Sequence, residues 1–259
     1  MRLHVREWGD PHAAPVVCVH GVAGHNGRWA QLAEERWAER FRVIAVDLRG
    51  HGHSGWERPW TFETHVADLI ETIDGLGLAQ PDWVGHSFGG RLLLELAARH
   101  PERMRRAALL DPAIHVLPDV AEWVASTELE PPEWTSVEAW LGTRDDADGI
   151  DMTRASADVA LQVEALPDGR VRRRTSQEAV VSIYRELATE PPPPEVLTMP
   201  ALLLYAPAYG LVRPEHVDAY GRRAKIVTVP GMHMVMWAAF DETADAVERF
   251  LSEDPGAER

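Results

Sequence analysis

The sequence feature that most constrains the fold is the pentapeptide Gly85-His86-Ser87-Phe88-Gly89. A short apolar run, Asp82-Trp83-Val84, precedes it, and a stretch with leucines at helical spacing follows it and ends at Pro101. This pattern predicts a buried strand, a sharp turn with a serine at its apex, and a helix. The two outer glycines allow strand and helix to approach closely, and the helix directs its unsatisfied N–H groups at the turn. We therefore expect the hydroxyl of residue 87 to project away from a sheet.

Elsewhere in the chain, apolar runs alternate with helical patterns. Continuous apolar runs such as 16–20 are typical of strands buried on both faces of a parallel sheet. The alternation predicts an α/β fold with a doubly wound, mostly parallel sheet. Further strands are expected over 3–8, 42–47, 106–111, 201–205 and 225–229, and helices over 29–39, 64–76, 214–220 and 241–251.

The pattern changes after Pro112. Residues 113–195 carry helical patterns and no convincing strand, and Pro191-Pro192-Pro193-Pro194 ends the segment as a stiff extended tether. The expected organisation is a core of residues 1–112 and 196–259 with a helical insertion, residues 113–195, over the sheet.

Composition narrows the partners. The 259 residues include 41 acidic and 26 basic side chains, a formal charge of −15, which disfavours binding to nucleic acid or to an anionic membrane. Cys18 is the only cysteine, so no intrachain disulfide can form. No apolar run reaches the ~18 residues of a membrane span. These observations predict a cytoplasmic protein. Separately, we expect it to be a monomer or a homodimer.

Four segments in this order resemble the α/β-hydrolase superfamily over essentially the whole chain. They are His20-Gly21, the glycine-rich loop 47–54 (Asp-x-Arg-Gly-x-Gly-x-Ser), the Ser87 pentapeptide, and Gly231-Met232-His233. The resemblance implies the α/β-hydrolase fold, with the insertion at the place of the family's helical cap. It also implies serine esterase-like chemistry without a metal or organic cofactor.

The resemblance assigns Ser87 as the nucleophile and His233 as its general base, because a serine hydroxyl needs a base within hydrogen-bond reach. His20 and His86 fall at positions that the family uses for loop packing. His51 and His53 form an H-x-H pattern, which we interpret as part of a surface loop because no third metal ligand of suitable spacing accompanies it.

The acid of the triad departs from the family's commoner pattern. Tyr209 stands after strand 201–205 where an aspartate is expected, and tyrosine offers no charge-assisted hydrogen bond to imidazole at neutral pH. The family's second acid site, at the end of the preceding strand, holds Asp111. We therefore predict Asp111 as the acid that orients His233. The alternatives are that Asp111 caps a turn beside Pro112, that the acid is one of two weaker candidates, or that the site is damaged; the weaker candidates are Asp218 and Asp241.

The oxyanion hole needs two backbone N–H groups. The resemblance assigns one to Phe88, directly after the nucleophile, and the other to Val22, directly after His20-Gly21. The register between Val22 and Ala23 stays open.

Several tryptophans are candidates for an apolar or aromatic substrate pocket, although each alone is an ordinary core residue. We expect Trp123, Trp140 and Trp237 to contact substrate; Trp56, Trp60 and Trp134 are weaker candidates. The Arg172-Arg173-Arg174 run fits either a carboxylate site or a solvated edge of the insertion.

The predicted function is hydrolysis of small to medium carboxylic esters or lactones with apolar or aromatic groups, through an acyl-enzyme on Ser87. Serine at the turn disfavours haloalkane dehalogenases and epoxide hydrolases, which need aspartate there. Carbon–carbon bond hydrolases and perhydrolases on the same triad remain open. A catalytically weak ligand-binding homologue also remains open, because of Tyr209.

Overall fold

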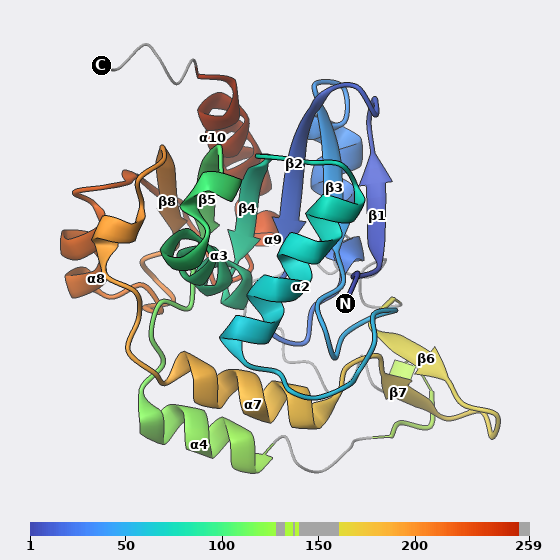
Figure 1. Ribbon diagram of the computed structural model, residues 1–259. Helices are drawn as coiled ribbons and strands as arrows, with labels where there is room; N and C mark the ends of the chain where they lie inside the picture. The colour runs from blue at the N-terminus through green and yellow to red at the C-terminus, as the bar shows by residue number, and fades with distance from the viewer. Residues whose placement is uncertain (128–132, 137, 140–160, 254–259) are drawn as a thin grey trace.

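The computed structural model describes residues 1–127, 133–136, 138–139 and 161–253. Within these residues the centre is a seven-stranded sheet with the order β1-β3-β2-β4-β5-β8-β9 (Figure 1). β1 runs antiparallel to β3, and every other neighbouring pair is parallel, as the alternating pattern predicted. The strands are β1 Val5–Trp8, β2 Ala14–Val19, β3 Phe41–Val46, β4 Asp82–His86, β5 Arg106–Leu110, β8 Ala201–Tyr205 and β9 Lys225–Thr228.

The described helices follow the predicted positions closely in all but one place. Residues 29–39, expected as one helix, form a 3-10 turn, a short α-helix and a π-helical turn. Trp29 and Trp37 at its two ends are fully buried, with ring centroids 6.4 Å apart. The helices of the core are α1 Ala30–Leu32, α2 Phe62–Gly75, α3 Phe88–Arg99, α8 Pro214–Tyr220, α9 Val235–Ala238 and α10 Phe240–Ser252.

The sheet divides the interior into two cores because successive strand residues face opposite sides. On β2, Val17 and Val19 pack with α2 and α3, whereas Val16 and Cys18 pack with α10 and the Trp29–Trp37 segment. All four residues are fully buried. Burial on both faces explains why the central strands read as continuous apolar runs.

The described part of the insertion is not purely helical. It contains the helices α4, Pro118–Thr127, and α7, Gln177–Leu187, but also an antiparallel hairpin of β6, Val163–Ala165, and β7, Val171–Arg173. The expectation of no strand over 113–195 is therefore wrong here. Each strand has three residues, too few for an alternating pattern to stand out, yet the Pro167-Asp168-Gly169 turn between them was a hairpin signal.

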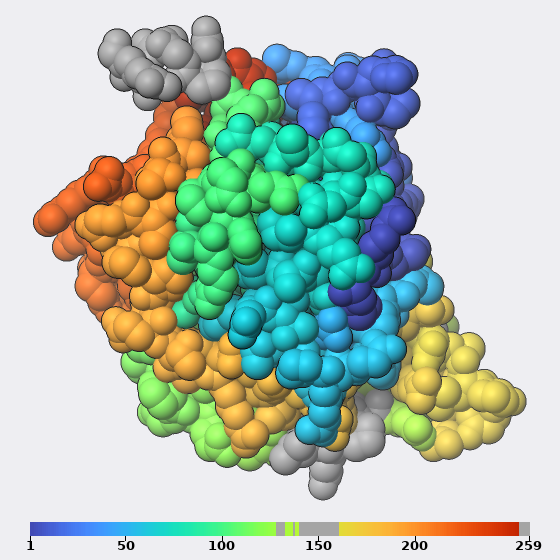
Figure 2. Space-filling view, in the orientation of Figure 1, coloured from blue at the N-terminus to red at the C-terminus, as the bar shows by residue number. Residues whose placement is uncertain are grey.

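The described part of the insertion lies beyond the carboxyl ends of the parallel strands, where α4 and α7 pack side by side (Figure 1). The hairpin projects from the body of the molecule at the lower right of Figure 2. It is joined to the 47–54 loop by Gly52 N–H, which donates to Arg174 O at 2.7 Å, and by Ser176 N–H, which donates to Gly50 O at 2.8 Å. This edge of the sheet is where open α/β sheets bind ligands.

Candidate active site

Ser87 occupies the reversal between β4 and α3, and its backbone is in an unusual conformation. β4 ends at His86 and α3 begins at Phe88, so the whole reversal falls on one residue. Ser87 has a φ of +54° and a ψ of −117°, a region that costs of order 1–3 kcal/mol for a residue with a side chain. Its N–H donates to Leu110 O at 3.0 Å, and its carbonyl accepts from Ala113 N at 3.0 Å. These bonds from β5 and the segment after it hold the serine in the strained turn.

Three glycines allow the backbone to close around Ser87. A Cβ on Gly85 would lie 2.5 Å from Gly89 O, and one on Gly89 would lie 2.2 Å from Val19 O. A Cβ on Gly21 would lie 2.8 Å from Ser87 Cβ. Since real Cβ atoms do not approach other heavy atoms this closely, the glycines are required by the packing of β2, the turn and α3.

Asp111 and His233 form a hydrogen-bonded pair beside this turn. His233 Nδ1 lies 2.6 Å from Asp111 Oδ2, and Asp111 is fully buried while the His233 side chain is 19% exposed. Asp111 Oδ1 accepts a second hydrogen bond from Ala206 N at 3.2 Å, which fixes the carboxylate plane. Because the carboxylate can only accept, Nδ1 carries the proton and Nε2 is left as the acceptor of the ring. That tautomer is the one a general base needs.

Two other rings contact the His233 ring. His86 Nε2–H donates to His233 O at 2.9 Å, with the two ring centroids 4.6 Å apart. Tyr209 stacks on His233 at 4.8 Å and an interplanar angle of 15°. Burial, followed by the proximity of His233, holds the pKa of His86 well below its usual range. His86 is therefore a neutral support for His233 rather than a second base.

No hydrogen bond among the described residues joins the Ser87 hydroxyl to His233. Both residues line the same pocket, and catalytic hydrogen bonds of ligand-free enzymes are often long until substrate binds.

The N–H groups of Val22 and Phe88 are the candidate oxyanion donors. Phe88 opens α3, so its N–H has no partner within the helix. Ala23 N–H donates to His51 Nε2 at 3.2 Å, which engages the alternative donor and favours Val22 in the open register. Val22 itself lines the pocket with Ser87.

Two buried imidazoles fix this loop. His51 Nδ1–H donates to Arg49 O at 3.0 Å, and His20 Nδ1–H donates to Gly21 O at 2.7 Å while His20 Nε2 accepts from Leu48 N at 3.0 Å. Burial lowers the pKa of His51 to about 4, and burial, with the neighbouring His51 next, holds the pKa of His20 well below its usual range. Both rings stay neutral near pH 7, so each can donate from one nitrogen and accept at the other.

Backbone strain is concentrated here. Among the described residues, those other than glycine with positive φ are Ala23 (+55°), Ser87 (+54°) and Asp111 (+39°). They lie in the loop after β2, at the turn between β4 and α3, and directly after β5. Strained residues of this kind cluster at functional sites.

A pocket of about 440 Å³ opens over Ser87 between the sheet edge and the insertion. α4 contributes Val120, Trp123 and Val124, and α7 contributes Tyr184 and Leu187. The remaining described lining residues are Gly21, Val22, Arg28, His86, Ser87, Ala113, Val116, Tyr209, Leu211, His233 and Met234. The described lining is mostly apolar, with a few polar side chains, as is typical of small-molecule sites.

Of the three tryptophans expected to contact substrate, one lines the pocket, one does not, and one is not described. Trp123 lines the pocket and is 66% exposed. Trp237 is buried in the core beneath the α10 side of the sheet and is not among the described lining residues, because a large aromatic ring is accommodated there by packing. Trp140 lies outside the described residues.

Arg28 is a lining residue that the sequence reasoning missed. It is the only Arg, Lys, Asp or Glu among the described residues that line the pocket, and it is 8% exposed. Its guanidinium lies 5.7 Å from the Trp237 ring centroid, and Nη1 is 3.8 Å from Met234 Sδ. An arginine beside a tryptophan carried no recognisable motif, so only the fold could place it in the pocket.

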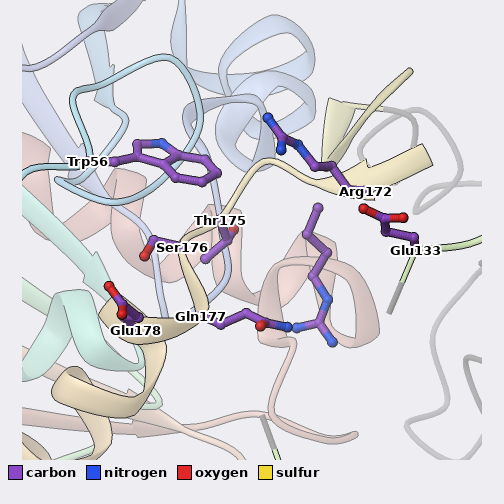
Figure 3. Close-up of a pocket in the computed structure, with 8 residues that line it drawn as sticks. Trp56, Glu133, Arg172, Thr175, Ser176, Gln177 and Glu178 are labelled. Atoms are coloured by element: carbon purple, nitrogen blue, oxygen red, sulfur yellow. The ribbon is translucent and has the colours of Figure 1, made fainter. Parts of the chain in front are cut away.

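A second cavity, of about 350 Å³, is shown in Figure 3. None of its described lining residues also lines the pocket that contains Ser87. Trp56, Arg172 and Arg173 line it together with the start of α7. Arg172 Nε donates to Glu164 Oε1 at 2.6 Å across the hairpin. This ion pair within the hairpin favours the interpretation that residues 172–174 form a solvated edge of the insertion.

The alternative acids lie elsewhere. Asp218 is exposed on α8, and Asp241 accepts from Arg36 Nη1 at 3.1 Å on the surface. Tyr209, at the family's commoner acid position, contacts the face of the His233 ring. Asp111 is the acid that the fold brings to Nδ1.

None of the helices within the described residues combines the length and apolarity needed to cross a bilayer.

Comparison with known proteins agrees with this architecture. The family model for the alpha/beta hydrolase fold matches residues 14–185. Lipase LipV of Mycobacterium tuberculosis is 34% identical over 215 residues, which span 80% of each chain. Pimeloyl-[acyl-carrier protein] methyl ester esterase of Methylococcus capsulatus is 31% identical over 225 residues, 83% of this chain and 78% of the relative. The crystal structure of E-2-(acetamidomethylene)succinate hydrolase shares the fold, with a TM-score of 0.86 at 22% identity, over 97% of this chain and 95% of the other. With its seven-stranded sheet, its serine turn and these relatives, the chain belongs to the alpha/beta hydrolase fold family.

Proposed function

We propose that this hydrolase cleaves carboxylic esters or lactones by nucleophilic catalysis, with Ser87 as nucleophile, His233 as general base and Asp111 as the acid that orients the base. The observation that carries the proposal is the 2.6 Å hydrogen bond from His233 Nδ1 to the buried Asp111 carboxylate. It leaves Nε2 of the ring able to accept a proton in the pocket that Ser87 also lines.

The proposed reaction has two halves. Ser87 Oγ attacks the ester carbonyl carbon and gives its proton to His233 Nε2, and the N–H groups of Val22 and Phe88 stabilise the oxyanion. Collapse of the tetrahedral intermediate breaks the bond to the alcohol, which takes the proton from His233. Water then attacks the acyl-enzyme with His233 again as base, which releases the acid and restores Ser87. This chemistry requires no metal or organic cofactor.

The substrate class follows from the pocket. Its volume of about 440 Å³ suits a small to medium acyl or alcohol group, and its apolar walls favour aliphatic or aromatic substituents. We infer that residues 113–195 act as a cap, because α4 and α7 supply the wall opposite Ser87. The lipase and methyl ester esterase among the relatives support ester chemistry.

Two measurements on the purified chain test the proposal. Hydrolysis of a panel of p-nitrophenyl esters should be detectable, and a fluorophosphonate probe should label wild type but not Ser87→Ala. Thermal melting of Ser87→Ala should stay close to that of wild type, which shows that the variant is folded. A folded wild-type chain that neither turns over any ester nor takes up the probe would instead favour a ligand-binding homologue.

A further inference from the structure

Outside the candidate active site, His4 near the N-terminus lies close to Asp47 and His53 of the 47–54 loop, and all three are side chains of types that bind metals. His4 Nδ1 lies 3.0 Å from Asp47 Oδ2, and His53 Nδ1 lies 3.6 Å from the same oxygen. One potential ligand atom from each of the three residues lies within 4.8 Å of the other two. The H-x-H pattern therefore separates in the structure. His51 is buried and accepts from Ala23 N–H, whereas His53 is exposed and lies beside Asp47.

Hydrogen bonds that involve the backbone hold His4 and Asp47 in position. His4 precedes β1, and its carbonyl accepts from Asp47 N at 2.8 Å where β1 pairs with β3. Asp47 Oδ1 accepts from Asn26 N at 2.7 Å, and Oδ2 accepts from His53 N at 3.0 Å. Asp47 is only 1% exposed, while the two imidazoles are 45% and 56% exposed. The carboxylate is thus fixed with one oxygen directed at two rings that remain accessible to solvent.

The spacing fits a small divalent cation. Bonds of about 2.0–2.2 Å to nitrogen and oxygen place neighbouring ligand atoms about 3–3.6 Å apart, which matches the two measured separations from Asp47 Oδ2. The third separation can close by rotation of the exposed rings. The side-chain amide of Asn26 lies 3.0 Å from His4 Nδ1, and an amide can present its oxygen as a further donor after a flip.

We propose that His4, Asp47 and His53 form a binding site for a borderline divalent cation such as Zn²⁺, which no part of the hydrolytic mechanism uses. Two imidazoles and one carboxylate suit Zn²⁺, Co²⁺ or Ni²⁺ better than Mg²⁺ or Ca²⁺, which prefer an all-oxygen shell. A bound ion would tie the N-terminal segment to the 47–54 loop. It would therefore stabilise the fold in proportion to its occupancy.

Arg174 gives the proposal a distinctive signature. Its Nη1 donates to His53 Nε2 at 3.1 Å, which places the proton of the neutral ring on Nδ1. A metal at Nδ1 requires the opposite tautomer, with the proton on Nε2, so the guanidinium must turn away. Arg174 and the cation also repel each other. Removal of this side chain should therefore strengthen metal binding, although Arg174 is not a ligand.

The experiment is titration of the untagged chain with Zn²⁺ by calorimetry, with Co²⁺ absorption as an independent probe of coordination. Wild type should bind one equivalent and melt at a higher temperature as Zn²⁺ is added. His4→Gln and His53→Gln should each weaken binding by at least about tenfold, and Arg174→Gln should tighten it. His100→Gln is the matched control, because His100 also lies near a carboxylate, that of Glu102 at 3.5 Å, but has no third partner of this kind among the described residues.

Two results of these measurements would contradict the metal site. The proposal is overturned by a folded wild type that shows no stoichiometric binding and no Zn²⁺-dependent shift in melting temperature. It is also overturned by a His4→Gln, His53→Gln double variant that binds as wild type does. Ester hydrolysis is not the readout, so the result is independent of the function proposed for Ser87.

Discussion

Replacement of Asp111 by asparagine tests the acid assignment most sharply, because the structure determines how the new amide must orient. Ala206 N–H donates to Asp111 Oδ1 at 3.2 Å, so an asparagine would turn its oxygen to that donor. Its NH₂ group would then face His233 Nδ1 and donate to it. This reverses the tautomer, places the ring proton on Nε2, and removes the acceptor that Ser87 needs.

The magnitude follows from two costs. The productive orientation of the amide leaves the Ala206 N–H buried and unsatisfied, which costs about 1–3 kcal/mol. A neutral amide also forms a weaker hydrogen bond to imidazolium than a carboxylate does, by about 1–1.5 kcal/mol. The sum, about 2–4.5 kcal/mol, corresponds to a decrease in kcat/KM of about 30-fold to 2,000-fold at 1.36 kcal/mol per factor of ten.

The assay is kcat/KM for a p-nitrophenyl ester that wild type hydrolyses, with thermal melting to establish that the variant is folded. Asp218→Asn is the matched control: it removes an exposed carboxylate on α8 and should leave kcat/KM unchanged. Nitrogen-15 NMR of the histidine rings should show His233 protonated on Nδ1 in wild type and on Nε2 in the variant. A folded Asp111→Asn enzyme within about threefold of wild type, with the control also unchanged, would refute this account of the acid.

Three other predictions concern the tightly packed Gly89, the pocket residue Arg28 and the buried His65. Gly89→Ala places a Cβ 2.2 Å from Val19 O and should lower the free energy of unfolding, measured by urea titration, by more than about 3 kcal/mol. Gly77→Ala, with open space around the new Cβ, should cost only about 1 kcal/mol because of the positive φ at that position. Equal losses in the two variants would show that the close approach at Gly89 is unimportant. Arg28→Met should lower kcat/KM for the p-nitrophenyl monoester of a dicarboxylic acid about tenfold more than for the butyrate, and an equal effect on both esters would exclude a role for Arg28 in binding substrate charge. Burial lowers the pKa of His65 to about 3, so below pH 6.5 the unfolded chain binds a proton that the folded chain does not. The free energy of unfolding therefore falls with decreasing pH by about 1.4 kcal/mol per pH unit from this residue. Between pH 5 and 6, the slope of the unfolding free energy against pH should be smaller by about this amount in His65→Leu than in wild type, and an unchanged slope would contradict the prediction.

The sequence was sufficient for those parts of the site that depend on local backbone. The Ser87 turn was predictable because two glycines and the change from strand to helix lie within a few residues of it. The Asp111–His233 contact joins residues 122 apart, and only the resemblance to a family suggested it. The pocket wall was less accessible, because the face that α4 turns to Ser87 depends on how the insertion packs on the core. Trp123, an expected substrate contact, does line the pocket, whereas Arg28 was missed.

The position of the acid follows from the sheet rather than from a particular loop. β5 and β8 are parallel neighbours, with Leu110 paired to Leu204, so the residues after both strands emerge side by side at the same edge. Asp111 N–H donates to Leu204 O, and its carboxylate reaches across to the N–H of Ala206, the first residue after β8. An acid after either strand can therefore reach one imidazole delivered by the loop after β9. Because Asp111 already contacts His233 Nδ1, the proposed triad needs no acid after β8, and that loop instead supplies Tyr209, which stacks on the His233 ring.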